Sequence, residues 1–529
     1  MIETKVIPRN ELPLFSPEEL DLIYNQIELK DFIGIPFSAA NIKKQIELKK
    51  ESFNESKRIN LAHTLEKNYS GIDRKNEVLK NIKLLKEKNT YTITTGHQVC
   101  LYGGPLYFFI KILHVIKLCN TLKEQYPKYH FVPVFWMASE DHDSLEIESL
   151  KLFNKTLTWK HEQTGAVGHF NTKNLSVVKD ELSELFNGKS ELHAYLNALQ
   201  GGNYGVAFRN WLHHVFGDKG LIVLDANQVI LKSEMKSYFS KELKEEFSNQ
   251  CIEETNTKLR SINRRPQIHS RPINLFYMHE GSRTRITREG ELFKLGQETL
   301  NEDKILKLVN SNPERFSPNV ALRPLYQEVI LPNLCYIGGM AELKYWTQLK
   351  NIFTSCAIPY PMLKMRANVL WIDKVSSKLM RQLNLTPNEL FESNVTLEKK
   401  AVKKEDPNPI NKNALDKHLH AIQQIYTDAI RKDEGIRPRV EAELKKIEHL
   451  YKGLESKIEK SKKNSFEGQL KKIGKLKERL FPGQKLQERS VNLLHFCNQA
   501  GPKERIEDLY NAIDPLSTDF TILIENETE

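Results

Sequence analysis

Two apolar runs, YTITT (91–95) and FVPVFWM (131–137), flank a helical run that extends from Pro105 to about Lys123. Short β-rich runs joined by a helix are typical of a β-α-β unit, in which a crossover helix connects two parallel strands. Parallel sheets are covered by helices on both faces, so their strands read as nearly continuous apolar runs. The stretch 91–137 therefore predicts an α/β fold with a parallel sheet.

Polar residues follow each of these predicted strands at its carboxyl end. Gly96-His97-Gln98 comes after the first strand, and Ser139-Glu140-Asp141-His142-Asp143 comes after the second. Ligands of open α/β sheets bind just beyond the carboxyl ends of the strands, so we predict a site here.

The acidic cluster supplies the candidate catalytic residues, which are Glu140, Asp141, His142 and Asp143. They could bind a substrate ammonium group, and one of them could take its proton. The alternative is a strand-end turn or a helix N-cap. A metal site is a weaker interpretation, because adjacent residues rarely converge on one ion.

A second strand–glycine–helix unit follows the same plan. Cys335–Ile337 is a predicted strand that ends in Gly338-Gly339, and a helix extends from Ala341 to Phe353. Another short apolar run, 220–225, ends in Asp225 and predicts a further strand of the same sheet.

The first unit contains a glycine turn, Gly103-Gly104, directly before Pro105. Proline suits the first position of a helix, and the N–H groups at a helix N-terminus favour phosphate or carboxylate. This predicts an anion site, although the pattern is neither GxGxxG nor a Walker loop. The alternative is a turn that only redirects the chain.

Arginines gather in residues 264–296, among alternating segments that predict antiparallel strands. They could receive carboxylates or phosphates, or they could form ordinary ion pairs on a solvated strand face. The net charge of +10 would suit anionic ligands. No CxxC pair, no N-terminal apolar segment and no membrane-spanning run is present, so we expect a reduced, cytoplasmic protein.

A heptad pattern occupies residues 413–480, where apolar seam residues recur at alternating spacings of four and three. They are Leu415, Leu419, Ile422, Tyr426 and Ala429, followed by Val440, Leu444, Ile447, Tyr451, Leu454 and Ile458. Such spacing predicts a coiled coil, and Gly435 and Pro438 break it into a helical hairpin or bent arm. We therefore expect a helical N-terminal lead-in (1–89), a parallel-sheet core with insertions at about 150–215 and 260–300 (90–380), a coiled-coil arm (410–482) and a C-terminal segment returning to the core (483–529).

Four motifs carry a resemblance to a known family: TGHQVCLYGGPLY (95–107), PVFWMASEDHD (133–143), SPNVALRPLYQEVILPNLCYIGGMAELKYW (317–346) and LQER (486–489). In this order, and with a coiled coil before the last motif, the chain resembles the bacillithiol biosynthesis cysteine-adding enzymes. The resemblance implies a Rossmann-like core and a coiled-coil arm that forms a homodimer.

The resemblance also implies the last step of bacillithiol synthesis, in which the carboxyl group of cysteine is joined to the amine of glucosaminyl malate. ATP or ADP would be the nucleotide, with no metal expected beyond Mg²⁺ accompanying it. The predicted substrate- or nucleotide-binding residues are Thr95, Gly96, His97, Gln98, Gly103, Gly104, Asn319, Arg323, Gly338, Gly339, Glu342, Tyr345, Gln487 and Arg489. Among them, Arg323 is the candidate for the malate carboxylates.

Two alternatives belong to other classes. One is a non-catalytic nucleotide-sensing or scaffold protein dimerised by its coiled coil, against which the clustered acids and histidine argue. The other is a synthetase-like enzyme acting on RNA, which only the basic arm supports. Lysine and arginine are spread widely along the chain, so nucleic acid is a weak prediction.

Overall fold

The computed structural model describes residues 2–24, 29–73, 75–153, 155–186, 190–279, 281–405 and 412–526. The chain divides into two compact units. The larger unit consists of Met1–Trp371 with Leu486–Ile524, and the smaller unit consists of Ile372–Lys485 with Glu525–Glu529. The chain therefore leaves the larger unit after Trp371, returns to it at Leu486 and leaves it again after Ile524.

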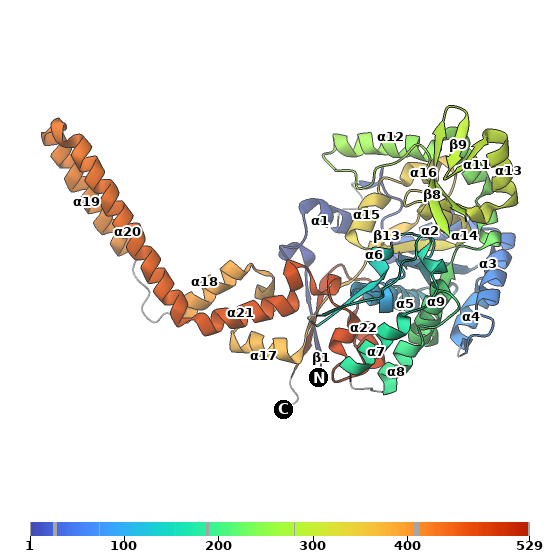
Figure 1. The fold of residues 1–529 in the computed structure, drawn as a ribbon, viewed down its shortest axis with the longest axis horizontal. Helices are drawn as coiled ribbons and strands as arrows, with labels where there is room; N and C mark the ends of the chain where they lie inside the picture. The colour runs from blue at the N-terminus through green and yellow to red at the C-terminus, as the bar shows by residue number, and fades with distance from the viewer. Residues whose placement is uncertain are drawn as a thin grey trace. The chain divides into compact units, whose positions relative to one another are not determined.

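A five-stranded parallel sheet forms the centre of the larger unit (Figure 1). Its strands are β2 (Thr90–His97), β3 (His130–Met137), β6 (Ile222–Asp225), β12 (Asn333–Gly338) and β13 (Met362–Met365). They lie in the order β13-β12-β2-β3-β6, with every neighbouring pair parallel. The chain runs outward from β2 in one direction and then crosses back to β12, which is the doubly wound topology of Rossmann-like folds. The predicted fold class is confirmed.

Strand β3 shows why these sequences form a sheet that is covered on both faces. Val132, Val134 and Trp136 pack into one apolar cluster, whereas Phe135 and Met137 pack into another. Helix α5 (Tyr107–Gln125) crosses from β2 to β3, and most of its residues are buried. Alternate residues of a strand point to opposite faces, so an apolar run without polar alternation requires helices on both sides.

Both long crossovers carry additional structure. Between β3 and β6 lie a hairpin, β4 (Ser149–Leu152) and β5 (Lys155–Thr158), and helices that include α9 (Tyr204–Phe216). Between β6 and β12 lie α10 (Val229–Ser233), α11 (Lys236–Glu245) and α12 (Phe247–Ser261).

The β6–β12 crossover also contains the predicted antiparallel strands. β7 (Leu275–His279), β8 (Ser282–Glu289), β9 (Leu292–Leu295), β10 (Glu298–Asn301) and β11 (Phe316–Pro318) form one sheet. The insertion extends beyond the predicted residues 260–300, because β11 pairs with β7.

The N-terminal region is helical except at its start. The helices are α1 (Pro17–Tyr24), α2 (Ile42–Ser52), α3 (Glu55–Asn68) and α4 (Asn76–Leu84). Residues Ile2–Ile7, however, form strand β1 of a second sheet, in the order β1-β15-β14 with β15 (Phe520–Glu525) and β14 (Asn368–Ile372). The lead-in over residues 1–89 was predicted to be helical, and Ile2–Ile7 departs from that prediction. The strand partner of β1 lies at the other end of the chain, where no local pattern could indicate it.

The smaller unit contains the predicted helical hairpin, formed by α19 (Lys412–Lys432) and α20 (Arg437–Ser465) (Figure 1). A 3-10 turn at Glu434–Ile436 joins them, and Asp433 accepts the N–H of Gly435. Tyr451 OH donates to Asp416 Oδ1 across the hairpin at 3.2 Å. The coiled-coil prediction is confirmed, although the side chains of the predicted seam residues 415 and 458 lie outside those described.

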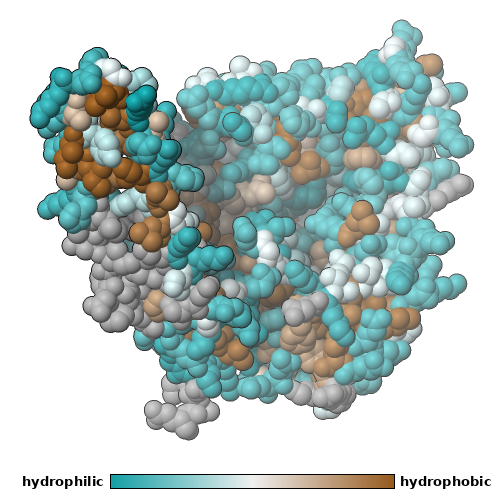
Figure 2. All heavy atoms as spheres, turned by 60° about the vertical axis from the view of Figure 1, so that its left-hand side comes forward, coloured by the Kyte–Doolittle hydropathy of each residue, from teal (hydrophilic) through white to brown (hydrophobic). Residues whose placement is uncertain are grey.

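One face of this hairpin remains apolar and exposed. Ile425, Leu450 and Leu454 are 69%, 71% and 52% exposed. Leu450 and Leu454 are four positions apart on one helix, so they share a face. Figure 2 shows apolar side chains gathered on the hairpin. The hairpin by itself therefore leaves large apolar side chains uncovered.

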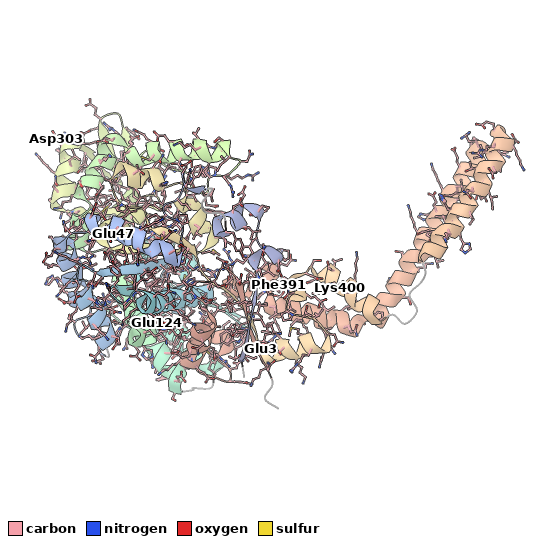
Figure 3. All side chains as sticks on the ribbon, turned by 180° about the vertical axis from the view of Figure 1, so that it is seen from behind. Glu3, Glu47, Glu124, Asp303, Phe391 and Lys400 are labelled. Carbon is pink, nitrogen blue, oxygen red and sulfur yellow. The ribbon has the colours of Figure 1, made fainter. Side chains whose placement is uncertain are left out.

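Three further helices complete the smaller unit: α17 (Lys374–Gln382), α18 (Asn394–Glu405) and α21 (Glu467–Leu480). Phe391 packs against Phe481 with ring centroids 5.5 Å apart, and Lys400 forms an ion pair with Glu392 at 2.6 Å. Figure 3 shows Phe391 and Lys400 within this group of helices. Across both units, none of the helices that the structure describes is long and apolar enough to cross a membrane.

Candidate active site

A cavity of about 740 Å³ lies at the carboxyl ends of the parallel strands in the larger unit. Gly96 and His97 at the end of β2 line it, and so does Gly339 directly after β12. The strand order reverses between β2 and β12, and this switch point is where open α/β sheets bind ligands. The volume lies within the range of small-molecule sites.

The cavity brings together many of the residues that were predicted to form the site. Those that line it are Gly96, His97, Gln98, Glu140, Asp141, Asn319, Arg323, Gly339, Glu342, Tyr345 and Arg489. The predicted residues that do not line it are Thr95, Gly103, Gly104, His142, Asp143, Gly338 and Gln487.

The Gly103-Gly104 turn is structural, which corrects the prediction of an anion site there. Both glycines are buried, with φ angles of +80° and +63°. The Gly103 N–H donates to the Cys100 carbonyl, and the Gly104 N–H donates to the Leu101 carbonyl. Helix α5 begins only at Tyr107. The turn therefore has no N–H group to offer an anion, and it needs glycine for its backbone conformation.

Three other predicted residues are also committed to the interior. Thr95 Oγ1 donates to the Ile337 carbonyl at 2.7 Å, joining β2 to β12. Gly338 accepts the Arg366 N–H. Gln487 accepts the Trp371 N–H at 2.9 Å and donates to the Trp371 carbonyl at 3.0 Å. These contacts position strands, and none of them reaches the cavity.

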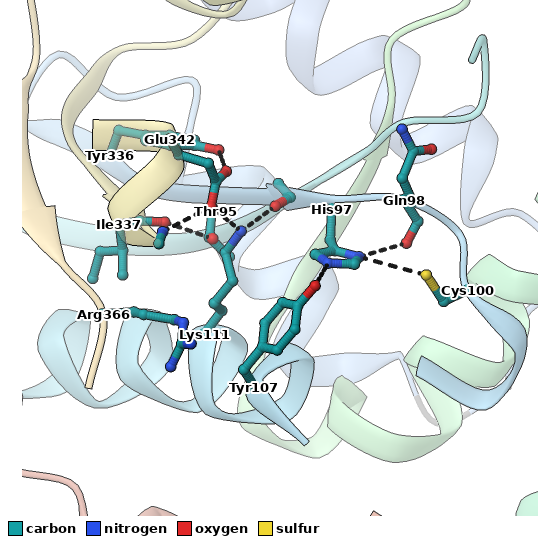
Figure 4. Close-up of polar contacts among 12 residues, drawn as sticks. Thr95, His97, Gln98, Cys100, Tyr107, Lys111, Tyr336, Ile337, Glu342 and Arg366 are labelled. Carbon is teal, nitrogen blue, oxygen red and sulfur yellow. Dashed lines mark hydrogen bonds and ion pairs between the residues drawn. The ribbon is translucent and has the colours of Figure 1, made fainter. Parts of the chain in front are cut away.

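An ion pair connects the helix that follows β2 to the helix that follows β12, across the switch point (Figure 4). Lys111 Nζ on α5 donates to the Gly96 carbonyl at 2.6 Å and to Glu342 Oε2 at 2.7 Å. Glu342 also accepts from Tyr336 OH at 2.6 Å and from the Gly339 N–H at 2.7 Å. Burial by itself raises the pKa of Glu342, but the Lys111 ammonium and these donors hold it below its usual value. Glu342 is therefore a fixed anion that orients the Gly339 turn.

His97 is neutral. Its burial, reinforced by the nearby Lys111 cation, lowers its pKa to about 4. The ring Nδ1 lies 3.1 Å from the Gln98 carbonyl, and Nε2 lies 2.9 Å from Tyr107 OH (Figure 4). A carbonyl only accepts, so Nδ1 carries the proton and Nε2 accepts from the tyrosine. Both nitrogens are used, and His97 supplies no positive charge to a phosphate.

The acidic cluster after β3 is held by cations from the β6–β12 crossover. Glu140 Oε1 lies 2.6 Å from the buried Lys232 Nζ, and Glu140 Oε2 accepts from Ser317 Oγ. Asp141 lies 3.3 Å from Arg283 Nη1 and accepts from Gln98 Nε2 at 2.6 Å. Both carboxylates are committed to ion pairs inside the protein, which argues against either as the predicted proton acceptor.

The other two members of the predicted catalytic cluster lie outside the cavity. His142 is exposed, and its Nδ1 lies 3.1 Å from Arg283 Nη1. Asp143 occupies the N-cap of the short helix α6 (Ser144–Ile147), without a side-chain capping bond. His142 and Asp143 therefore lie outside the cavity, although Glu140, Asp141 and Glu146 on either side of them line it.

The cavity wall is rich in arginine. Arg323 lies 5.6 Å from the ring centroids of both Trp136 and Tyr336, and Arg366 lies 5.0 Å from that of Tyr107. Two of the lining arginines have carboxylate partners, Arg283 with Asp141 and Arg366 with Glu488. The others form no ion pair with any residue that the structure describes: Arg271, Arg285, Arg323 and Arg489.

Several lining residues were not singled out from the sequence: Glu19, Tyr107, Trp136, Glu146 and Arg366. Trp136 and Tyr107 fall inside the motifs quoted above, where aromatic residues in an apolar run look like core. Glu146 lies only three positions beyond the acidic cluster. Glu19 belongs to helix α1, and nothing local connects it to the sheet. Proximity to the quoted motifs could have indicated Trp136, Tyr107 and Glu146.

Both units match domain descriptions of one family. Residues 10–367 match the N-terminal Rossmann-like domain of bacillithiol biosynthesis BshC, and residues 369–525 match its C-terminal coiled-coil domain. The chain belongs to the BshC family.

Curated relatives extend along nearly the whole chain. A protein of Flavobacterium psychrophilum is 38% identical over 96% of this chain and 97% of its own length. One of Flavobacterium johnsoniae is 35% identical over 96% and 97%. One of Bacillus cereus strain G9842 is 27% identical over 83% and 86%. Each carries the name "Putative cysteine ligase BshC".

The BshC domain boundary and the structure divide the chain differently in one respect. Leu486 and Arg489 fall within the range of the coiled-coil domain, yet they belong to the larger unit and line its cavity. Glu488 anchors this segment by accepting from Arg366 and Asn368 at 2.8 and 2.6 Å. The segment after the hairpin therefore completes the wall of the Rossmann-like site.

Proposed function

We propose that this chain is a cysteine ligase that joins the carboxyl group of L-cysteine to the amine of glucosaminyl malate, as the last step of bacillithiol biosynthesis. The names of its relatives support the ligase class. The observation that carries the proposal is the charge of the cavity. Several arginines there form no ion pair with a described residue. Such arginines can bind the anionic groups of substrates.

The malate carboxylates are assigned to Arg323. Its guanidinium is held against two aromatic rings, and Nη1 donates to Gln327 Oε1 at 3.1 Å. A guanidinium fixed in this way presents planar donors that match a carboxylate. Arg323 also has Tyr345 beside it, which lines the same wall.

A nucleotide is proposed to activate the cysteine carboxyl group, because a carboxylate does not itself exchange oxygen for an amine. The cavity fits a nucleotide in three respects: its size, its place at the switch point, and the exposed Arg489 on its wall. Among the described residues, no group of three or more His, Cys, Asp or Glu is placed to hold a metal ion. A Mg²⁺ ion accompanying the nucleotide would therefore be bound mainly through the phosphates.

The test uses the purified full-length chain with L-cysteine, glucosaminyl malate and ATP. We expect a new thiol whose mass equals the two substrates minus water, detected by mass spectrometry after thiol labelling. Omission of each component in turn should abolish it, and the nucleotide product identifies the activated intermediate as an adenylate (AMP) or an acyl phosphate (ADP). Absence of the thiol with ATP, with ADP and with GTP would contradict the proposed function.

The exposed apolar face of the hairpin supports a homodimer. Ile425, Leu450 and Leu454 present a surface that a second copy of the same hairpin would bury. Knobs-into-holes packing between two hairpins would complete a seam that one hairpin leaves partly open.

A further inference from the structure

Glu146 occupies a distinctive position in the cavity. It lies on helix α6, directly after the acidic cluster that follows β3, and its side chain lines the cavity. It is exposed, so a substrate can reach it. Its backbone carbonyl accepts from Cys100 Sγ at 3.5 Å, which fixes the helix against the β2–α5 turn.

The carboxylate of Glu146 differs from every other carboxylate on the cavity wall. The others each have a cation within ion-pair distance: Glu19 with Lys344 (2.9 Å), Glu140 with Lys232 (2.6 Å), Asp141 with Arg283 (3.3 Å) and Glu342 with Lys111 (2.7 Å). Glu146 forms no ion pair and no side-chain hydrogen bond with any residue in the described part of the chain. Its oxygens therefore remain available to a ligand.

The groups around Glu146 make it a stronger base than an ordinary glutamate. Partial burial raises its pKa, and the like charges of Asp143 and Asp141 raise it further. Cys100 and Tyr107 face it as well, and both are neutral because burial raises their pKa values well above neutrality. Arg366 lies 5.0 Å from the Tyr107 ring centroid and is paired with Glu488, and Arg283 is paired with Asp141.

We propose that Glu146 is the general base that takes the proton from the amine of the acceptor substrate. This inference rests on the proposed function. The ammonium group gives one proton to the Glu146 carboxylate, and the resulting amine nitrogen forms the bond to the activated cysteinyl carbonyl carbon. The activating phosphate leaves with the electron pair of the broken C–O bond, and the nitrogen, which gains a positive charge on forming the C–N bond, releases its second proton to solvent so that a neutral amide remains. The proton then passes from Glu146 to solvent.

Other groups in the cavity are less suited to this role. Glu140 and Asp141 would each have to lose a protein cation before binding a substrate ammonium. His97 is neutral, but both of its ring nitrogens already have partners. A carboxylate without a partner both attracts the ammonium and accepts its proton without breaking an existing contact.

The test compares two acceptors in Glu146→Gln, which preserves the shape of the side chain. With glucosaminyl malate at pH 7 we expect a rate loss of roughly 100-fold or more, the usual contribution of a general base. Hydroxylamine is unprotonated at this pH and needs no base, so formation of cysteinyl hydroxamate should continue at close to the wild-type rate. Equal loss with both acceptors, or loss with neither, would overturn the role of Glu146.

Two neighbouring variants make the test specific. Asp143→Asn removes a like charge and lowers the pKa of Glu146, so the acidic limb of the pH–rate profile should move to lower pH. Glu148→Gln, outside the cavity and beside His161, should leave the profile unchanged. An unmoved limb in Asp143→Asn would count against Glu146. If the wild-type chain formed neither amide nor hydroxamate, the proposed function itself would fail, which is a different result from failure of Glu146 alone.

Discussion

Lys111 Nζ lies 2.7 Å from Glu342 Oε2, an ion pair that joins the helix after β2 to the helix after β12. The same ammonium bonds the Gly96 carbonyl at the end of β2. These two helices begin on either side of the point where the strand order reverses. One buried lysine therefore fixes the two sides of the cavity, at the ends of β2 and β12, relative to each other.

Removal of this lysine should destabilise the larger unit strongly. In Lys111→Met, the partly buried Glu342 would lose its cation, and breaking a buried pair costs at most about 3–5 kcal/mol. Urea unfolding followed by circular dichroism measures the loss. Adding Glu342→Gln should cost less than the sum of the single changes, because the two residues share one interaction. Strictly additive losses would show that the pair is not coupled.

The Glu342 pKa also predicts how the stability of the fold changes with pH. Its folded-state pKa lies below the usual value of 4.5. The contribution of ionised Glu342 to the free energy of unfolding is therefore fully present above pH 4.5. It is lost as the pH falls through the lower, folded-state pKa. Glu342→Gln should remove this acid dependence.

His97 should make the protein less stable as the solution becomes mildly acidic. Its pKa falls from 6.5 in the unfolded chain to about 4 in the fold, so the unfolded state binds a proton first. Stability should decline between pH 6.5 and 4, by about 3 kcal/mol for this group. His97→Gln should flatten that part of the stability curve, whereas His63→Gln, which removes an exposed histidine on α3, should not. An unchanged slope in His97→Gln would contradict a buried, neutral imidazole.

Arg323 should contribute to substrate binding through its geometry as well as its charge. Arg323→Lys keeps the charge but loses the planar donors and the contact with Trp136. We expect the KM for glucosaminyl malate to rise roughly 10- to 100-fold, as for loss of a charge-assisted hydrogen bond, with a smaller change in kcat. Steady-state kinetics measure both constants. Arg264→Lys is the matched control, since Arg264 pairs with Asp21 and does not line the cavity. A KM that stays at the wild-type value would place the malate carboxylates elsewhere.

The sequence predicted the parts of the fold that depend on neighbouring residues. The buried strands are largely apolar, and each ends in glycines or polar residues, so Gly96 and Gly339 could be assigned to one edge of a sheet, whereas Arg323 was predicted only after the family resemblance. The heptad spacing around Val440 likewise predicted the hairpin. These patterns involve residues close together in the sequence, and the structure contains the elements that they predicted.

Other features depend on contacts that are distant in sequence. Lys111 and Glu342 are 231 positions apart, and apolar residues flank Lys111 in its helix, so no local pattern connects the two. Glu140 looked like a catalytic acid until the fold brought Lys232 beside it. Gln487 lies in a motif with Arg489, but the 3-10 turn buries the glutamine and exposes the arginine. Composition could not separate such neighbours, because only packing decides which of them faces the cavity.

The exposed face of the hairpin should hold two copies of the chain together. Leu450→Glu combined with Leu454→Glu places charge where a second hairpin would pack, and the charges would be buried without partners. Light scattering after size-exclusion chromatography should show a dimer for the wild type and a monomer for the double variant. Deletion of residues 413–480 should also yield a monomer. Lys452→Glu changes an exposed residue of the same helix away from this face, and it should leave the dimer intact. A double variant that still dimerises would place the interface on another surface, and the apolar side chains of α19 and α20 would then require a different partner.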